Sequence, residues 1–362
     1  MKPVNHHPAE SGIGRDLEAS TSRLRRARLK DVAAAAGTSV ATASRVLSGT
    51  GFVTEETRAG ILGAAKQLNY HPNLHARSLR KDSVHSIGLL VPNLMDAYYA
   101  ALADAIDQSL ADRKYRLLIA CTRDDPASER DLLYEMSGQA VDGLIWVPAA
   151  PSPALMDTLH GQHTCIVSII RRVPGDGVDT VVFQDQADSQ AATRHLVNLG
   201  HRRIGYIGGE IRYGSHHDRW QGYLTAMEQA GLAVDEQLVK LGADRSTWGF
   251  VATDDLLRLP VPPSAIFVAS NAIMPGVIRT LRLRGVQVPE NLSLICFDDI
   301  EWFSLAVPPI TAVSVSHARL AATALELLFV RMENPGAADR QPALIRIGCD
   351  LVLRGSTAPY RS

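Results

Sequence analysis

The chain of 362 residues is 46% hydrophobic and 6% aromatic, which is enough apolar content for two or three domains with buried cores. Its formal net charge is −1, but residues 1–82 carry 13 Lys and Arg against 7 Asp and Glu, and the remainder carries 24 against 31. A basic amino-terminal segment on an acidic body indicates that only that segment meets a polyanion. No apolar run approaches the roughly 18 residues of a membrane-spanning helix.

Cysteine usage and the amino-terminal sequence both bear on the cellular compartment. The four cysteines are far apart, form no CxxC pair and lie in apolar runs such as LLIACT and LSLICFDD. This pattern predicts buried free thiols in a reducing environment. Residues 1–20 are polar and lack the apolar core of a signal peptide. We therefore expect a cytoplasmic protein with no membrane partner.

Residues 1–27 are rich in Pro, Gly, Ser and His and end in the basic run SRLRRAR. This composition is typical of a disordered extension. The arginines of the run either supplement contacts to phosphates or belong to a solvated tail, and composition does not decide between the two.

A first short helix is predicted over residues 29–36. Leu29, Val32 and Ala33 have the i, i+3, i+4 spacing of one apolar helix face. Gly37 then suits the sharp turn that ends this helix.

A second helix is predicted over residues 40–47, with Ser39 as its N-cap. Ala43 and Val46 can pack inward, which leaves small residues and Arg45 on the outward face. A solvated helix would prefer Glu and Lys there, whereas this face suits close approach to another surface. The major groove of DNA admits a helix and presents guanine acceptors to Arg and thymine methyl groups to small apolar side chains.

A third helix is predicted over residues 57–68, with Thr54 as its N-cap. Pro72 prevents this helix from continuing, and Asn73 can cap one further short helix over residues 74–80. The apolar stripe of the third helix comprises Ile61, Leu62, Ala65 and Leu68.

From residue 84 onward, buried strands alternate with helices at steady intervals, which predicts a doubly wound parallel sheet. The pattern restarts near residue 185, so the body consists of two similar α/β halves, with a helix and a strand near the carboxyl terminus crossing back between them. The expected strands are SIGLLVPNL, RLLIACT, VDGLIWVP, TCIVSII, RIGYIGG, AIFVAS and LSLICFDD, and the expected helices span residues 98–113, 127–139, 187–199, 219–230 and 274–284.

The phrases KDVAAAAGTSVATASRVL, VTEETR and LNYHPNLHARSLR resemble the headpiece of the LacI/GalR family of bacterial transcription regulators. The resemblance implies a helix-turn-helix domain whose second helix reads base edges. It also implies a hinge helix that folds on the operator and inserts a leucine into the minor groove. The implied contacts are Val40, Ala41 and Arg45 with bases, Ser39, Thr42, Ser44 and Thr54 with phosphates, and Asn73, Ala76 and Leu79 with the minor groove.

The headpiece departs from the family pattern at two positions. Arg28 stands where a Thr or Ser usually caps the first helix, so we expect that end to be less well capped. Ala43 stands where Val is usual, which predicts a thinner headpiece core. Neither departure argues against DNA binding.

The body is similar to the same family through VDGLIWVP, HLVNLGHRRIGYIGG, DRWQGY, PENLSLICFDDI, PPITAV and LVLRGSTA. The resemblance implies a type I periplasmic-binding-protein fold that holds a small effector between two lobes and forms a homodimer. The expected domains are a disordered extension (1–27), an all-α helix-turn-helix domain (28–71), a hinge (72–83) and a two-lobed body (84–358). In that body the first lobe spans 84–183 plus 312–338, and the second spans 184–311 plus 339–358.

Effector contacts are expected at or soon after the carboxyl ends of strands, where ligands of open α/β sheets lie. Arg, Asn and Asp offer the paired donors and acceptors that vicinal sugar hydroxyls need. For each candidate the alternative is packing between the lobes or a solvated loop. The candidates are Arg219, Asn271 and Asp298, followed by Tyr98, Tyr99, Thr122, Arg123, Trp146, Arg171 and Trp302.

Three departures from the family pattern concern the charge of this site. Ala272 replaces an Asp, Ile170 stands where an Asp is common, and Asp96-Ala97 replaces the usual Asn-Pro. Because carboxylates are lost while arginines remain, we hypothesise that the pocket prefers an anionic ligand, such as a sugar acid or sugar phosphate, over a neutral sugar.

Sequence signals for catalysis and cofactors are weak. GYIGGE lacks the GxGxxG spacing of a dinucleotide site. The adjacent His216 and His217 cannot share one face of a regular element, which disfavours a metal site, and there is no GxSxG nucleophile elbow. We therefore expect no catalytic residues, no metal and no cofactor.

The sequence favours a repressor that binds a pseudo-palindromic double-stranded DNA operator and responds to a carbohydrate or sugar-acid effector. Three alternatives remain open. The protein could use the ligand as a corepressor or act as an activator, it could be a sugar-modifying enzyme on the same fold, or it could be a sugar-binding protein.

Overall fold

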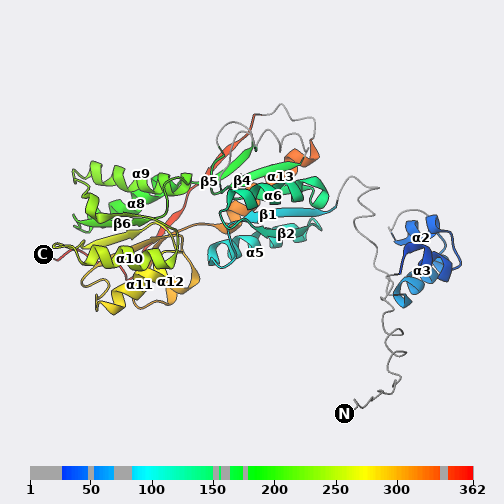
Figure 1. The fold of residues 1–362 in the computed structure, drawn as a ribbon, viewed down its shortest axis with the longest axis horizontal. Helices are drawn as coiled ribbons and strands as arrows, with labels where there is room; N and C mark the ends of the chain where they lie inside the picture. Colours follow the sequence, from blue (N-terminus) through cyan, green and yellow to red (C-terminus); the bar gives the residue numbers. More distant parts are fainter. Residues whose placement is uncertain are drawn as a thin grey trace, which may run out of the picture. The chain divides into compact units, whose positions relative to one another are not determined.

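The computed structural model describes residues 27–47, 53–68, 84–149, 155, 164–173, 178–334 and 341–361. The chain forms two compact units, residues 1–82 and residues 83–362 (Figure 1). Residues 1–26 of the expected extension and the hinge residues Asn73, Ala76 and Leu79 lie outside the described residues.

The amino-terminal unit contains α1 (Leu29–Ala35), α2 (Val40–Leu47) and α3 (Glu55–Gln67). Leu62 and Leu68 were expected in its core but are exposed, because α3 turns the face that carries Ile61 toward the other two helices. All three helices contribute to one small apolar core, which comprises Val32, Ala33, Ala43, Val46, Ile61, Ala64 and Ala65.

The start of α1 is capped in a way that the sequence analysis missed. The carboxylate of Asp31 accepts a hydrogen bond of 2.7 Å from the backbone N–H of Arg28. This is the backward half of a capping box and stabilises the first turn without a Ser or Thr. Gly37, with a φ of +61°, makes the left-handed turn between α1 and α2 that a β-carbon would disfavour.

The body contains two six-stranded sheets, each with helices on both faces. Every neighbouring pair in the first sheet is parallel. In order across the sheet, its strands are β11 (Leu344–Ile347), β5 (Asp179–Phe183), β4 (Cys165–Ile169), β3 (Gly143–Trp146), β1 (Ser86–Val91) and β2 (Arg116–Cys121).

The second sheet repeats this order of connections and is parallel except for its edge pair β12–β10. Three of its inner strands, β9, β8 and β6, are buried along their whole length, because helices cover both faces. In order, its strands are β12 (Asp350–Val352), β10 (Thr311–Ser314), β9 (Ser293–Phe297), β8 (Ala265–Val268), β6 (Ile204–Gly208) and β7 (Val239–Leu241).

Helices cover the first sheet on both faces. α5 (Ala97–Ala111) and α13 (His317–Glu333) pack on the face that buries Leu89, whereas α6 (Pro126–Glu135) packs on the face that buries Leu90. α6 continues into a π-helical turn, η1 (Met136–Ala140), rather than staying α-helical to residue 139 as expected.

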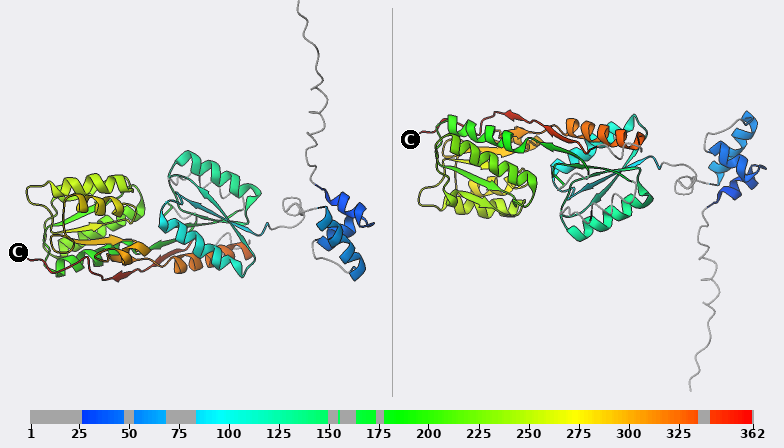
Figure 2. Two further views of the ribbon diagram at one scale, coloured as in Figure 1. Left: turned by 90° about the horizontal axis from the view of Figure 1, so that it is seen from below. Right: turned by 90° about the horizontal axis from the view of Figure 1, so that it is seen from above.

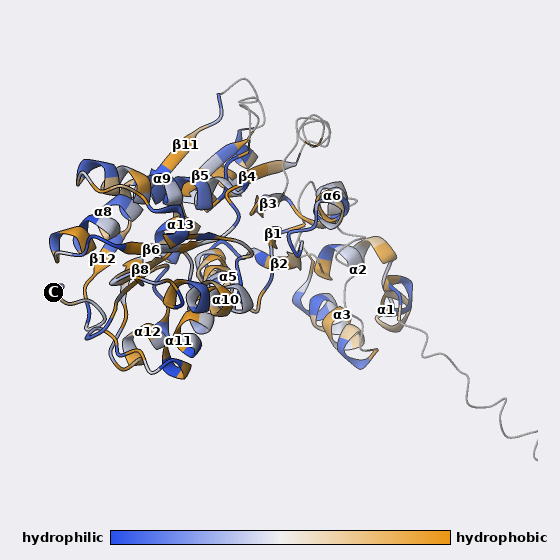
Figure 3. Ribbon diagram, turned by 60° about the vertical axis from the view of Figure 1, so that its left-hand side comes forward, coloured by the Kyte–Doolittle hydropathy of each residue, from blue (hydrophilic) through white to orange (hydrophobic). Residues whose placement is uncertain are grey.

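The second sheet is covered in the same manner, and Figure 1 shows its helix pairs on opposite sides of β6. α8 (Asp185–Asn198) and α9 (Gly214–Gln229) lie on one face. α10 (Ser246–Leu257) and α11 (Met274–Leu283) lie on the other. Figure 3 shows how α8 and α9 alternate hydrophilic and hydrophobic stretches, as expected of helices with one buried face.

Among the described residues, the chain passes between the sheets three times, after β5, β10 and β11. Figure 2 shows the carboxyl-terminal segment running from one lobe to the other. The predicted lobe boundaries differ from this topology at two strands. β10 was placed in the first lobe but pairs with β9 in the second, and β11 was placed in the second lobe but pairs with β5 in the first.

Several elements of the body were not predicted. β7 has three half-buried residues, too few for an alternation to be visible, and α10 begins with the weak helix formers of STWGF. The other unpredicted elements are β5, η2 (Glu236–Leu238), α12 (Glu301–Leu305) and β12.

Candidate functional site

The outward face of α2 is exposed as expected for a helix that contacts DNA. Ala43 and Val46 are buried against α1 and α3, which leaves Val40, Ala41 and Arg45 exposed. The Nε of Arg45 donates a hydrogen bond of 3.4 Å to the carbonyl of Ala41, so the guanidinium lies along the helix surface. These three side chains form a contiguous face that fits the major groove.

The expected phosphate contacts lie at the starts of α2 and α3. The Oγ of Ser39 accepts a hydrogen bond of 3.1 Å from the backbone N–H of Thr42, and Thr54 caps α3 in the same manner. Ser39 and Thr54 are exposed, and Ser44 is half-buried. A helix amino terminus capped by a hydroxyl suits a phosphate oxygen, because the remaining N–H groups and the helix dipole both favour negative charge.

In the body, a buried ionic cluster lies at the carboxyl edge of the second sheet. Arg219, on α9, donates from Nε to Asp185 (2.7 Å) and from Nη1 to Asp298 (3.0 Å) and to the carbonyl of Ala269 (2.8 Å). Its guanidinium carbon lies 3.7 Å from the centre of the Phe297 ring. Arg219 and Asp298, two of the expected effector contacts, are therefore hydrogen-bonded to each other, and Asp185 completes the cluster.

Burial and charge act in opposite directions on this cluster. Burial raises the pKa of Asp298 to about 6, although the nearby charge of Arg219 lowers it. Burial also raises the pKa of Asp185. For Arg219, burial alone would lower the pKa, but the charges of Asp298 and Asp185 hold it well above its usual value. The arginine therefore stays charged while both carboxylates are easier to protonate than in water.

A hydrogen bond between Asn271 and Asp96 joins the two lobes. The Nδ2 of Asn271, which follows β8, donates a hydrogen bond of 2.8 Å to the Oδ1 of Asp96. The same oxygen accepts from the backbone N–H of Tyr98 at 3.0 Å and caps α5. Tyr98 and Tyr99 are both buried, and the ring of Tyr98 packs against His317 with centroids 4.6 Å apart.

Arg171 lies at the carboxyl edge of the first sheet, and its guanidinium also donates hydrogen bonds to carbonyl and carboxylate oxygens. Its Nη1 donates to Asp124 at 2.5 Å and to the carbonyl of Pro148 at 3.0 Å. Its guanidinium carbon lies 4.0 Å from the centre of the Tyr213 ring, which belongs to the second lobe. Arg123, the third arginine expected at the site, is exposed.

These pairings remove the basis of the prediction that the site favours an anionic effector. Arg219 is shared by two carboxylates and Arg171 is paired with Asp124, so neither guanidinium offers uncompensated positive charge. The number of arginines can be read from the sequence, but the carboxylates that the fold places against them cannot.

Three further candidates lie apart from the ionic cluster. Trp146 is fully buried and its Nε1 donates to Glu129 at 2.7 Å, within the apolar cluster beneath α6. Trp302 is half-buried against Phe303 and packs on the far face of the second sheet. Thr122 is fully buried and accepts a hydrogen bond of 3.3 Å from the backbone N–H of Asp124.

Several buried polar atoms near the ionic cluster have no hydrogen-bond partner among the described residues. A polar ligand or water normally satisfies such atoms. The charges of Asp298 and Arg219 both act on Tyr98, and those of Arg219 and Asp185 act on Tyr206, so both rings lie close to the cluster. The unpaired atoms are the hydroxyls of Tyr98 and Tyr206, Nδ1 of His216 and Nε2 of His317.

The residues that sequence reasoning missed at this site follow a simple signal. These residues are Asp96, Asp124 and Asp185, and each lies shortly after a strand or at the start of the following helix. Position alone could have identified them as candidates. Position could not have shown which carboxylate meets which arginine.

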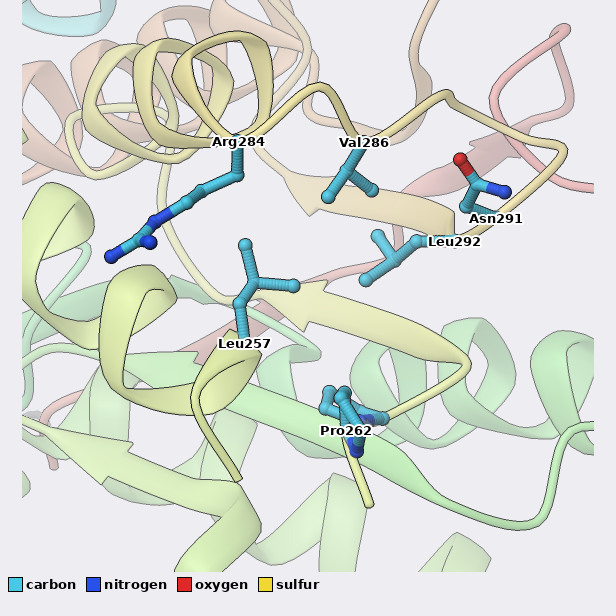
Figure 4. Close-up of a pocket in the computed structure, with 7 residues that line it drawn as sticks. Leu257, Pro262, Arg284, Val286, Asn291 and Leu292 are labelled. Carbon is cyan, nitrogen blue, oxygen red and sulfur yellow. The ribbon is translucent and has the colours of Figure 1, made fainter. Parts of the chain in front are cut away.

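A surface cavity of about 340 Å³ lies elsewhere on the second lobe (Figure 4). It is formed at the amino-terminal ends of β8 and β9, opposite to the edge where the ionic cluster lies. None of the predicted effector residues lines it. Its lining comprises Leu257, Pro262, Pro263, Arg284, Val286, Asn291 and Leu292.

The described ranges contain no group of three or more His, Cys, Asp and Glu side chains placed to hold a metal ion. None of their helices has both the length and the apolar character that crossing a membrane requires.

Family models match both units of the chain. Residues 28–73 match the model described as bacterial regulatory proteins, lacI family, and residues 193–357 match the periplasmic binding protein-like domain. The chain is also 31% identical over 330 residues to the HTH-type transcriptional repressor PurR of Haemophilus influenzae (strain PittEE), covering 91% of this chain and 98% of that protein. The PurR of Pasteurella multocida is 31% identical over 332 residues, with the same two coverages.

Solved structures give a consistent comparison. A transcriptional regulator CelR–cellobiose complex is 28% identical, with a TM-score of 0.68 and coverage of 91% of this chain and 100% of that chain. A putative LacI-family regulator from Sanguibacter keddieii is 30% identical, with a TM-score of 0.67 and coverages of 75% and 98%. The lac repressor dimer bound to operator and the anti-inducer ONPF is 22% identical with a TM-score of 0.78, covering 92% and 100%, and shows a shared fold.

Proposed function

This chain belongs to the lacI family of bacterial regulatory proteins, and from that membership we propose that it is a homodimeric repressor whose operator affinity is set by a small carbohydrate bound between its lobes. Its relatives are named transcriptional repressors, so the chain is a DNA-binding repressor with a ligand-binding body and not an enzyme. The operator, the effector and the dimer are the proposed parts. A repressor acts on the chromosome, which places the proposed activity in the cytoplasm.

The buried cluster of Arg219, Asp185 and Asp298 is the observation that carries the effector assignment. The Arg219 guanidinium donates to both carboxylates and holds them rigidly, so that their oxygens are fixed acceptors near the strand ends. Unpaired hydroxyls of Tyr98 and Tyr206 lie close to it. Hydroxyl groups of a sugar both donate and accept, so they match such a set. A structural relative at 28% identity is described as a complex with cellobiose, which supports this class of ligand.

The two-lobed topology supports the proposed coupling between effector binding and DNA binding. The effector residues belong to both lobes, and Asn271 already contacts Asp96 across them. A ligand that binds one arrangement of the lobes more tightly shifts the population toward it. We propose that this shift changes whether the paired hinges, including Leu79, can fold into the minor groove.

Exposed apolar residues on both lobes support a homodimer. β2 is the edge strand of the first sheet, and Leu118 and Ile119 on it are 40% and 42% exposed. On the second lobe, Phe250, Val251 and Leu283 are exposed on α10 and α11. Large exposed apolar side chains grouped on secondary structure commonly mark interaction surfaces, and a two-fold dimer would bury the same residues on each copy.

The experiment that tests the function selects operators from random double-stranded DNA with the full chain and measures affinity at fixed salt. We expect a pseudo-palindromic sequence bound far more tightly than random DNA. The Arg45→Ala variant should lose about 1–3 kcal/mol and relax one base position in each half-site. Absence of any sequence preference contradicts the proposed function.

A second candidate function is a repressor for which the effector is a corepressor and not an inducer. A corepressor would tighten operator binding, and an inducer would weaken it. The same titration, repeated with cellobiose and other sugars, distinguishes them by the direction of the change in operator affinity.

A further inference from the structure

Asp96 is the carboxylate at the effector site that lacks a basic partner. Its Oδ1 accepts from the Nδ2 of Asn271 (2.8 Å) and from the backbone N–H of Tyr98 (3.0 Å), and both donors are neutral. Within the described residues, no hydrogen bond reaches its Oδ2.

The other charges around Asp96 do not compensate it. Arg219 is shared between Asp185 and Asp298, and Arg171 is paired with Asp124. Four carboxylates therefore face two guanidiniums. Asp244, nearby, adds a further negative charge, and its Oδ2 lies 3.4 Å from the Nε2 of His216.

Two of the three peripheral arginines are also paired with carboxylates. Arg212 is paired with Glu210 at 2.6 Å, and Arg354 is paired with Asp299 at 2.6 Å. Arg123 is exposed at the end of β2.

A second, independent observation concerns buried hydroxyls close to Asp96 and the ionic cluster. Tyr98, the second residue of the helix that Asp96 caps, is 5% exposed, and its hydroxyl has no partner in the described part of the chain. The hydroxyl of the fully buried Tyr206 also has no hydrogen-bond partner among the described residues. Buried hydroxyls without partners cost free energy unless a ligand or water satisfies them.

We propose that Asp96 selects an effector that carries a protonated amino group, so that an amino sugar binds more tightly than the neutral sugar of the same shape, and the corresponding sugar acid binds least. The ammonium group donates to the free Oδ2 of Asp96, while hydroxyls of the ligand meet Asp298 and the tyrosine hydroxyls. This inference rests on the proposed effector site and names the class of ligand that the site takes.

A purely structural role does not account for the charge at this position. Asn caps a helix about as well as Asp does, and it could accept the hydrogen bond from Asn271 through its amide oxygen. A half-buried carboxylate without a basic partner is costly by comparison. The negative charge is therefore explained by a positively charged ligand group and not by the α5 cap.

The test measures binding of two matched series to the full chain by isothermal titration calorimetry. One series is glucosamine, glucose and glucuronate, and the other is the chitosan dimer, cellobiose and cellobiouronic acid. We expect the amine to bind about tenfold more tightly than the neutral sugar in at least one series, because a charge-assisted hydrogen bond contributes about 1.5–3 kcal/mol. In the Asp96→Asn variant the ratio of amine to neutral affinities should fall to about one.

The matched control is Asp125→Asn, which changes the N-cap of α6 in the same lobe. Asp125 accepts a hydrogen bond of 2.8 Å from the backbone N–H of Ser128 and is exposed, so its replacement should leave the ratio unchanged. Tightest binding of the acids, an unchanged ratio in Asp96→Asn, or no binding by any member overturns the proposal. Operator selection in parallel separates this failure from failure of the repressor function, since sequence-specific DNA binding does not depend on the ligand's charge.

Discussion

Arg219 holds two buried carboxylates in place, so its removal should be costly. In Arg219→Ala, Asp185 and Asp298 lose their cation while they remain buried, and breaking a buried ion pair in this way costs about 3–5 kcal/mol. The free energy of unfolding, measured with urea, should fall by that amount. The control Arg212→Ala breaks an exposed pair with Glu210, which should cost about 1 kcal/mol or less. Equal costs for the two variants would show that the buried cluster contributes no special stability.

Asp298 should give the body a measurable pH dependence. Its folded-state pKa of about 6 lies above the ordinary value of 3.8, so the folded state binds its proton more tightly than the unfolded state does. Its contribution to stability is therefore full below about pH 4 and is lost as the pH rises through about 6. Urea unfolding between pH 4 and 8 should show this decline in the native protein and a smaller one in Asp298→Asn. Identical pH profiles would contradict the assignment.

At the scale of residues, motifs located the site but not its charge balance. Arg219, Asn271 and Asp298 could be predicted because they lie in recognisable phrases after strands. Their partners are far away in the sequence: Asp185 lies 34 positions from Arg219, and Asp96 lies 175 positions from Asn271. The packing of α8 on α9 brings Asp185 to Arg219, and the approach of the two lobes brings Asp96 to Asn271. Because such contacts join residues far apart in the sequence, the number of arginines alone did not give the charge of the site.

At the scale of elements, the close packing of α8 on α9 positions the ionic cluster, because Asp185 begins α8 and Arg219 lies on α9. Gly222 allows this approach, since a β-carbon there would lie 2.2 Å from the backbone oxygen of Gln186. Gly222→Ala should therefore push the helices apart and lower the free energy of unfolding by about 1–3 kcal/mol. It should also weaken effector binding while the headpiece still binds DNA non-specifically.

Gly214→Ala is the matched control on the same helix. A β-carbon at Gly214 meets nothing within 4 Å, so the change in stability should stay within about 0.5 kcal/mol. If both variants behave alike in thermal and urea unfolding, the α8–α9 contact does not position the cluster.

The order of elements was largely predictable, whereas the assignment of strands to sheets was not. Buried strands such as β1, β6 and β9 are unbroken apolar runs with turn residues at their ends. β10 and β11 were exchanged between the lobes because the sequence does not record which edge a late strand joins. α10 was missed because its residues, STWGFVATDDLL, mix weak helix formers with a glycine at position 249 that packs against Ile273.

At the scale of the whole molecule, the exposed edge of the first sheet should join two copies. Ile119→Asp places a charge on that edge, so analytical ultracentrifugation should show a shift from dimer to monomer. Operator affinity should then fall by about 100-fold or more, because two linked headpieces no longer bind at once. Val261→Asp is the control, since Val261 is 59% exposed but lies away from that edge, before β8. A dimer that survives in Ile119→Asp contradicts the proposed surface.

The most direct test of the central claim measures operator affinity of the full chain with and without saturating effector, and effector affinity with and without operator. We predict that saturating effector changes operator affinity by about 5–150-fold. Adding operator should change effector affinity by the same factor, because the coupling free energy is shared by both sites. Arg219→Ala should abolish the effect of the ligand. Sequence-specific DNA binding that no bound ligand changes, or two factors that differ, would contradict the account.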